Sequence, residues 1–156
     1  MENKKTQKKY SNFFLMLAVS FAAMYITMYL NTYQIDHVYF SLTRFYMTCL
    51  GIAAMALIML LFMLKMYSDK KKNMVIIICS SVLFIGSLFL VRQQKPIGDI
   101  LWMKAMIPHH SIAILTSSRA DIKDPEVKKL ANDIIETQEK EIAQMKSMIK
   151  RLENEN

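Results

Sequence analysis

Two adjacent histidines in the C-terminal half of the chain follow two methionines at helical spacing. The local sequence runs Trp102-Met103-Lys104-Ala105-Met106-Ile107-Pro108-His109-His110. On a helix, Met103, Met106 and His110 share one stripe because they follow steps of three and four residues, and His109 is rotated by about 100° onto the adjoining stripe. Thioether sulfur and imidazole nitrogen are ligands for copper, particularly Cu(I). This stretch therefore predicts a metal site.

A second helical stretch brings two further methionines into reach. Met145 and Met148 lie near one face together with Gln138 and Glu141, and antiparallel packing of the two stretches could place both methionine groups at one height. The candidate metal ligands are Met103, Met106, His109, His110, Met145 and Met148. Methionine is also a common core residue, so packing is the simpler interpretation of Met145 or Met148 taken singly.

Histidine and methionine elsewhere in the chain have simpler interpretations. His37 follows Asp36 and is expected to be a solvated boundary residue, with a role as an extra ligand as the alternative. Methionines at four-residue spacing in two apolar runs could line a copper path, but packing in lipid explains them equally well. These are Met24, Met28, Met55, Met59 and Met63.

Three uncharged runs ahead of the histidines are long enough to cross a bilayer. They cover about residues 13–30, 45–64 and 74–91, and a hydrocarbon core of roughly 30 Å needs about 20 helical residues. The first run could be a cleaved signal peptide, but it lacks a small-residue cleavage site, so we expect it to remain as an anchor. Cys49 and Cys79 lie within these runs and are expected to be small buried hydrophobic residues. We predict a membrane domain over residues 1–92 and an extracytoplasmic domain over residues 93–156.

The distribution of Lys and Arg predicts the orientation. Four lysines precede the first run and four more separate the second run from the third, whereas residues 31–44 contain only Arg44. Because short cytoplasmic segments carry the excess of Lys and Arg, the N-terminus is expected to be cytoplasmic and the C-terminal domain is expected to lie outside the cytoplasm. The formal charge of +7 comes from these membrane-flanking segments, so a phosphate-binding face for nucleic acid is excluded.

The C-terminal residues are patterned as two amphipathic helices. Residues 99–118 are predicted to form one helix, which Pro108 is expected to bend. Asp124-Pro125-Glu126 is a strong helix start, and apolar residues then recur in steps of three and four to Leu152. The predicted fold is all-α, with three transmembrane helices followed by an antiparallel helical hairpin. A hairpin alone leaves its seam partly open, so we expect a homodimer or higher homo-oligomer through the hairpin, or docking onto the outer ends of the spans.

Residues 97–149 resemble the bacterial DUF305 family. The resemblance covers about the last third of the chain and rests on the Met-Ile-Pro-His-His core with the later Gln-x-x-Glu-Ile-x-x-Met. It implies a ferritin-like helical domain in the periplasm or outside the cell, here anchored in a bacterial cytoplasmic (inner) membrane, with copper-binding members linked to copper tolerance. Its motif maps onto Met103, Met106, His109, His110 and Met145, with Met148 following on the same helix. Many soluble members duplicate the helical pair, whereas this chain resembles a membrane-anchored subgroup with three N-terminal transmembrane helices and supplies half of a four-helix bundle.

We expect a membrane-anchored protein that buffers, transfers or confers tolerance to copper, as Cu(I) rather than Cu(II). Its expected partners are the lipid bilayer, a second copy and copper-handling proteins. The alternative is a non-catalytic structural or regulatory module whose hairpin mediates self-association or docks a partner. An enzyme is not expected, because none of the three histidines has Glu three residues before it, and a phosphate-binding Gly loop and a CxxC pair are both missing.

Overall fold

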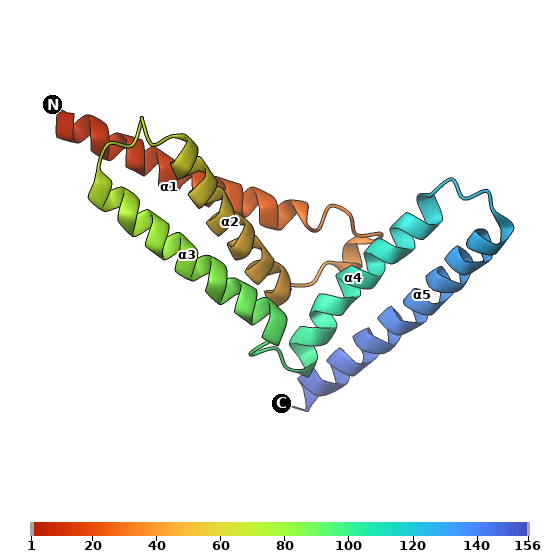
Figure 1. Cartoon of the computed structure of the whole chain (residues 1–156). Helices are drawn as coiled ribbons and strands as arrows, with labels where there is room; N and C mark the ends of the chain where they lie inside the picture. Colours follow the sequence, from red (N-terminus) through yellow and green to blue (C-terminus); the bar gives the residue numbers. More distant parts are fainter. Residues whose placement is uncertain (1, 156) are drawn as a thin grey trace. The chain divides into compact units, whose positions relative to one another are not determined.

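The structure is a computed structural model that describes residues 2–155, with side chains described from residue 6 onward. Five α-helices and one short 3-10 helix make up the described chain, which contains no strand, so the all-α prediction is confirmed (Figure 1). The elements are α1 (Glu2–Thr27), η1 (Ile35–His37), α2 (Leu42–Phe62), α3 (Lys70–Gln93), α4 (Asp99–Arg119) and α5 (Pro125–Asn154).

The chain divides into two compact units. The N-terminal unit contains Met1–Ile26 and Thr43–Lys95, and the hairpin unit contains Thr27–Leu42 and Pro96–Asn156. The α1–α2 loop, Thr27–Leu42, is thus grouped with the C-terminal helices, whereas the division expected from the sequence assigns it to residues 1–92. The signal for this grouping lies in polar contacts of the loop that hydropathy does not register.

Three helices of the N-terminal unit are long and apolar enough to cross a membrane. The qualifying segments are Thr6–Thr27, Leu42–Phe62 and Lys70–Gln93. Large apolar side chains on their surfaces are exposed, including Val82 and Ile85, which suits contact with lipid better than contact with water. Cys49 and Cys79 are free thiols. The expectation of burial is wrong for Cys79, whose side of α3 is exposed.

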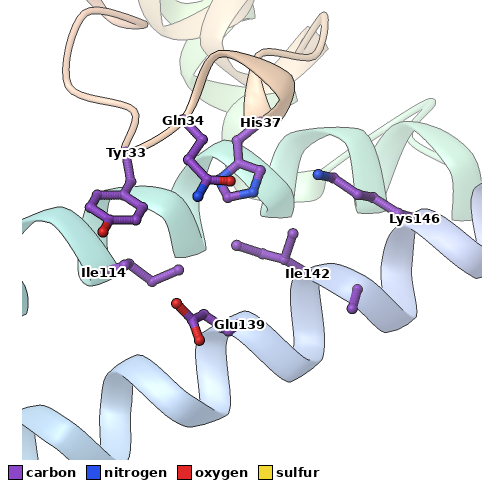
Figure 2. Close-up of a pocket in the computed structure, with 8 residues that line it drawn as sticks. Tyr33, Gln34, His37, Ile114, Glu139, Ile142 and Lys146 are labelled. Atoms are coloured by element: carbon purple, nitrogen blue, oxygen red, sulfur yellow. The ribbon is translucent and has the colours of Figure 1, made fainter.

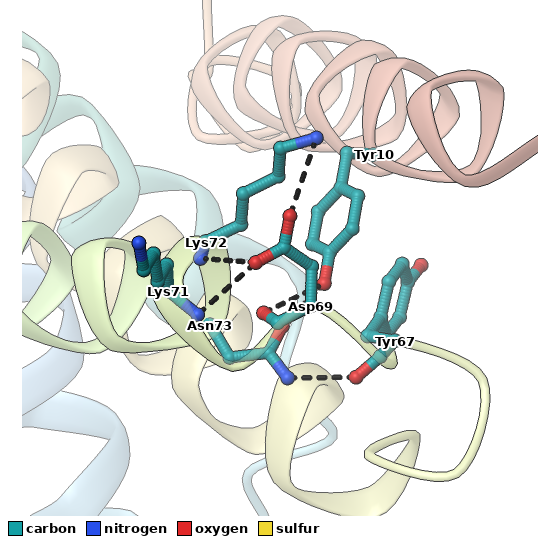
Figure 3. A network of polar contacts seen from close by, with 6 residues as sticks. All are labelled: Tyr10, Tyr67, Asp69, Lys71, Lys72 and Asn73. Atoms are coloured by element: carbon teal, nitrogen blue, oxygen red, sulfur yellow. Dashed lines mark hydrogen bonds and ion pairs between the residues drawn. The ribbon is translucent and has the colours of Figure 1, made fainter. Parts of the chain in front are cut away.

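A polar network fixes the start of α3 in the N-terminal unit (Figure 3). The Asp69 carboxylate caps the helix by accepting hydrogen bonds from the backbone N–H groups of Lys71 and Lys72, both at 3.1 Å. The Tyr10 hydroxyl donates to Asn73 Oδ1 at 2.7 Å, and Asn73 Nδ2 donates to the Tyr67 carbonyl at 2.7 Å. These bonds tie α1 to the α2–α3 connection. Around them lies an apolar cluster of Tyr10, Phe13, Ala56, Leu60, Tyr67 and Ile76.

The hairpin unit is built on the antiparallel pair α4 and α5. Helix α4 continues through Pro108, so the proline does not end it. The Asp124 carboxylate caps α5, accepting from the N–H groups of Glu126 and Val127 at 2.9 and 3.0 Å, as the sequence predicts. The apolar stripe of α5 packs into a core of Met103, Ile107, Ile114, Ile142, Met145 and Ile149. In the sequence this stripe begins at Val127, but Val127 is exposed and lies outside the core.

Candidate metal centre

The α1–α2 loop covers one side of the hairpin. Fully buried Ser111 of α4 accepts a hydrogen bond from the Tyr33 backbone N–H at 2.7 Å, and its Oγ lies 2.9 Å from His37 Nδ1. On α5, Lys146 Nζ donates to Asp36 Oδ2 at 2.6 Å. His37 is only 6% exposed. The expectation that His37 is solvated is wrong, because η1 turns its imidazole inward onto Ser111.

The environment of His37 keeps its imidazole neutral. Burial is the main cause lowering the pKa of His37, Lys146 lowers it further, and Asp36 and Glu139 act in the opposite direction. Since Ser111 Oγ already accepts from Tyr33, its hydroxyl proton is available to His37 Nδ1 when the ring is neutral. His37 therefore uses Nδ1 to hold the loop against α4.

A pocket of about 230 Å³ lies where the α1–α2 loop, α4 and α5 meet (Figure 2). Ile114 and Ile142 form apolar walls, and Glu139 and Lys146 of α5 supply one charge of each sign. None of the six candidate ligands is among its lining residues. The ammonium group of Lys146 also opposes a second cation at this place. The lining of this pocket therefore does not suit a metal ion.

His110 on α4 is held against Glu141 of α5. The Nδ1 atom of His110 is buried and has no hydrogen-bond partner, although it lies 3.2 Å from Glu141 Oε2, so the two groups are close without the alignment of a hydrogen bond. Burial is the main cause lowering the pKa of His110, with Glu141 opposing and His109 reinforcing the shift. The ring is therefore neutral at pH 7, as a metal ligand must be.

The separation of these two atoms suits a shared metal ion. Ligands about 2.0–2.1 Å from an ion at a near-tetrahedral angle are about 3.3 Å apart, close to the 3.2 Å between His110 Nδ1 and Glu141 Oε2. An unbonded buried nitrogen otherwise costs about 1–3 kcal/mol. A cation between the two atoms would remove this cost and neutralise the carboxylate, so these residues fit a metal.

The structure places the six residues predicted as metal ligands in different environments, from the buried core to the exposed surface. Met103 and Met145 are 4% and 6% exposed and lie in the hairpin core, with Met106 packed against it. His109 and Met148 are exposed, and the rings of His109 and His110 are 6.2 Å apart. The core position of Met145 agrees with the packing interpretation. Met106 and His110 are half-buried at the edge of the core.

Glu141 was not counted among the ligands predicted from the sequence. It shares a stripe with Gln138, Met145 and Met148, and Gln138 Nε2 donates to its Oε2 at 3.4 Å. A sequence pattern of soft sulfur and imidazole ligands does not indicate Glu141, because carboxylate oxygen is a harder ligand. Within the described residues, no group of three or more His, Cys, Asp or Glu could hold a metal. Among these four residue types, the described chain therefore brings together the His110–Glu141 pair alone.

Comparison with known proteins places the chain in a family. The family model described as domain of unknown function (DUF305) matches residues 90–155. The chain is also similar to uncharacterized protein L153 of Acanthamoeba polyphaga mimivirus, with 36% identity over 138 residues that cover 86% of this chain and 89% of the relative. An alignment of that length extends from the hairpin into the apolar helices. No solved structure gives a significant match. The chain belongs to the DUF305 family.

Proposed function

We propose that this chain is a membrane-anchored, non-catalytic metal-binding protein whose hairpin takes up copper on the non-cytoplasmic side and buffers it or hands it on. The observation that carries the proposal is the buried, unbonded Nδ1 of neutral His110, 3.2 Å from a carboxylate oxygen of Glu141. Structural histidines normally have both ring nitrogens satisfied when buried, and a bound ion is a simple way to satisfy this one.

The proposed membrane topology is supported by the contacts of the α1–α2 loop. In that topology the three apolar helices span the bilayer, and the loop and the hairpin both lie outside the cytoplasm. The Tyr33–Ser111 and Asp36–Lys146 hydrogen bonds require the loop and the hairpin to be on one side. Two candidate spans, α2 and α3, separate the loop from the hairpin along the chain, so the chain would cross the membrane twice and return to the same side. Because the relative is viral, the proposal concerns the side of the membrane and extends beyond a bacterial inner membrane.

His110 is the proposed centre of the site, with Met106 beside it on the same stripe and His109 on the adjoining one. Copper bound to thioether and imidazole would be held as Cu(I), whereas nitrogen and oxygen ligands favour a divalent ion. Met103 and Met145 stabilise the hairpin by packing in its core, since both side chains are buried. They could bind an ion only if the hairpin opened. Exposed Met148 is the remaining methionine that an incoming ion can meet directly.

The test is metal binding by the full-length chain in detergent or nanodiscs. Competition with chromophoric chelators gives the affinities for Cu(I) and Cu(II), for the unmodified chain and for His110→Ala. Loss of one metal ligand should weaken binding about tenfold or more. Ser118→Ala is the matched control, because Ser118 is an exposed residue of the same helix whose hydroxyl donates to the backbone carbonyl of Leu115. Equal, weak binding by the unmodified chain and His110→Ala would remove the proposal.

A second candidate function is a self-associating structural module. It is favoured by exposed apolar side chains on the hairpin, notably Leu130, Val127 and Trp102, since such residues often mark interaction surfaces. This candidate predicts association of the chain that chelators leave unchanged.

A further inference from the structure

The side of the hairpin away from the α1–α2 loop carries few charged side chains, and exposed Asp99 at the start of α4 is the charge on the stripe of Met106 and His110. At about 100° per residue, the loop side of α5 carries Glu139 and Lys146, both of which line the pocket beneath the loop. On the opposite side, Glu141 is the one charged side chain of α5 between Leu130 and Met148. We define the open face as Leu130, Ile134, Gln138, Glu141 and Met148 of α5 with Trp102, Met106, His110 and Ala113 of α4.

The open face has the composition of an interface. Leu130 is 59% exposed, Trp102 51% and Met148 38%, while the lysines and arginines of α5 lie on its other sides. A helix surface that meets only water normally carries charged residues. The open face instead places apolar side chains on both sides of a single central His110–Glu141 pair. Such a surface is suited to a partner that covers the apolar side chains and also provides a group or an ion that binds His110 and Glu141.

The central pair is an incomplete metal site. His110 Nδ1 and Glu141 Oε2 provide one nitrogen and one oxygen at a separation that suits a shared ion, and the described part of the chain has no third His, Cys, Asp or Glu in the same group. A transition metal such as Zn²⁺ is usually held by four ligands. The same pair supplied a second time would complete a set of two imidazoles and two carboxylates.

We propose that a second copy of this chain covers the open face and that the two His110–Glu141 pairs together bind one divalent transition-metal ion between the copies. In a two-fold interface the same patch is used on both chains, so the central pairs meet and the apolar side chains pack around them. This inference rests on the proposed function as a metal-binding protein. The donor set of two nitrogens and two oxygens selects Zn²⁺ or Cu²⁺ over Cu(I).

Electrostatics makes this association depend on the ion. Two Glu141 carboxylates brought together on a surface with few other charges repel each other, and the repulsion grows as water is excluded. A divalent cation neutralises both carboxylates and satisfies the buried nitrogen of each His110. The dimer is therefore stable with metal and weak without it, which distinguishes it from simple apolar self-association.

The experiment uses the full-length chain, freed of metal by a chelator and then titrated with Zn²⁺ or Cu²⁺ in detergent. Analytical ultracentrifugation gives the mass and metal analysis gives the ions bound per chain. The expected result is a doubling of mass with one ion per two chains. Glu141→Gln should weaken metal binding about tenfold or more, whereas Glu139→Gln, two residues away and facing the pocket beneath the loop, should change it by less than about twofold.

A variant outside the ligand set tests whether the second copy contributes to the site. Leu130→Glu places a charge on the open face, well away along α5 from Glu141, and should weaken dimerisation and metal binding together by about tenfold or more. Lys129→Glu introduces the same residue one position away, where it points outward, and should leave both within about twofold. Binding of one ion per single chain, unaffected by Leu130→Glu, would overturn the shared site.

The outcomes separate this inference from the proposed function. If copper binds a single chain and is lost in His110→Ala but kept in Glu141→Gln and Leu130→Glu, the shared site is wrong and the proposed function stands. A dimer that forms equally with and without metal also overturns the shared site. If the unmodified chain binds none of Zn²⁺, Cu²⁺ and Cu(I), both proposals fail.

Discussion

Replacing Ser111 by Ala should release the α1–α2 loop from the hairpin. The Ser111 Oγ is fully buried, accepts from the Tyr33 N–H at 2.7 Å and lies 2.9 Å from His37 Nδ1. Alanine leaves both groups without this partner. A buried polar group left unsatisfied costs about 1–3 kcal/mol, so two of them should reduce the free energy of docking by about 2–6 kcal/mol. The partly exposed Asp36–Lys146 pair and the packing of Tyr39 against the hairpin core still hold the loop in this variant.

Hydrogen exchange of the loop amides measures this effect directly. A loss of about 1.4 kcal/mol is a factor of ten in an equilibrium constant, so exchange of residues 27–42 should accelerate by more than about tenfold, within the range open to local unfolding. Ser118→Ala is the matched control on the same helix, since its hydroxyl donates to the backbone carbonyl of Leu115 and is exposed. Exchange of the Tyr33 amide at the same rate in both variants would refute the account of how the loop is held.

Further predictions concern the loop, the start of α5 and the topology. Because burial lowers the pKa of His37, docking should be fully stable above the ordinary imidazole pKa of about 6.5 and weaken as the pH falls below it. Hydrogen exchange of the loop amides, corrected for the pH dependence of the intrinsic exchange rates, would measure this loss. A docking equilibrium that is equal at pH 7.5 and pH 5 would contradict it. Asp36→Asn removes the 2.6 Å ion pair with Lys146. Because Asp36 is 60% exposed, the loss of docking free energy should be only about 0.5 kcal/mol. A loss as large as that from Ser111→Ala would contradict this and show that the ion pair dominates. Asp124→Ala removes the cap of α5 and should destabilise its first turn by about 1 kcal/mol, seen as faster exchange of the Glu126 and Val127 amides, with exposed Asp121→Ala as the control. In a background without Cys49 and Cys79, an impermeant maleimide added outside cells should label Lys123→Cys and spare Lys71→Cys; the reverse pattern would invert the topology.

Hydropathy and capping signals were enough to predict the helices. Uncharged runs of 18 to 20 residues located the three apolar helices, and Asp124-Pro125-Glu126 located the start of α5. Helix α1 begins at Glu2, ahead of the predicted run, because lysine-rich residues form helix readily and need no lipid around them. Boundaries set by charge alone could not detect this extension.

The polar contacts between distant segments could not be predicted from a single sequence. His37 and Ser111 are 74 residues apart, and each by itself has an ordinary surface interpretation. The same limit applies to Glu141, whose place opposite His110 follows from the register of α4 against α5. Helical periodicity fixes which face a residue occupies, but it does not fix the height at which two helices meet.

X-ray absorption spectroscopy of the metal-loaded, full-length chain tests the central claim most directly, because it identifies the ligand atoms around the ion. The account predicts imidazole scattering around the bound ion that disappears in His110→Ala and persists in Ser118→Ala. A spectrum without imidazole scattering, or one that His110→Ala leaves unchanged, would contradict the assignment of His110 as the centre of the site.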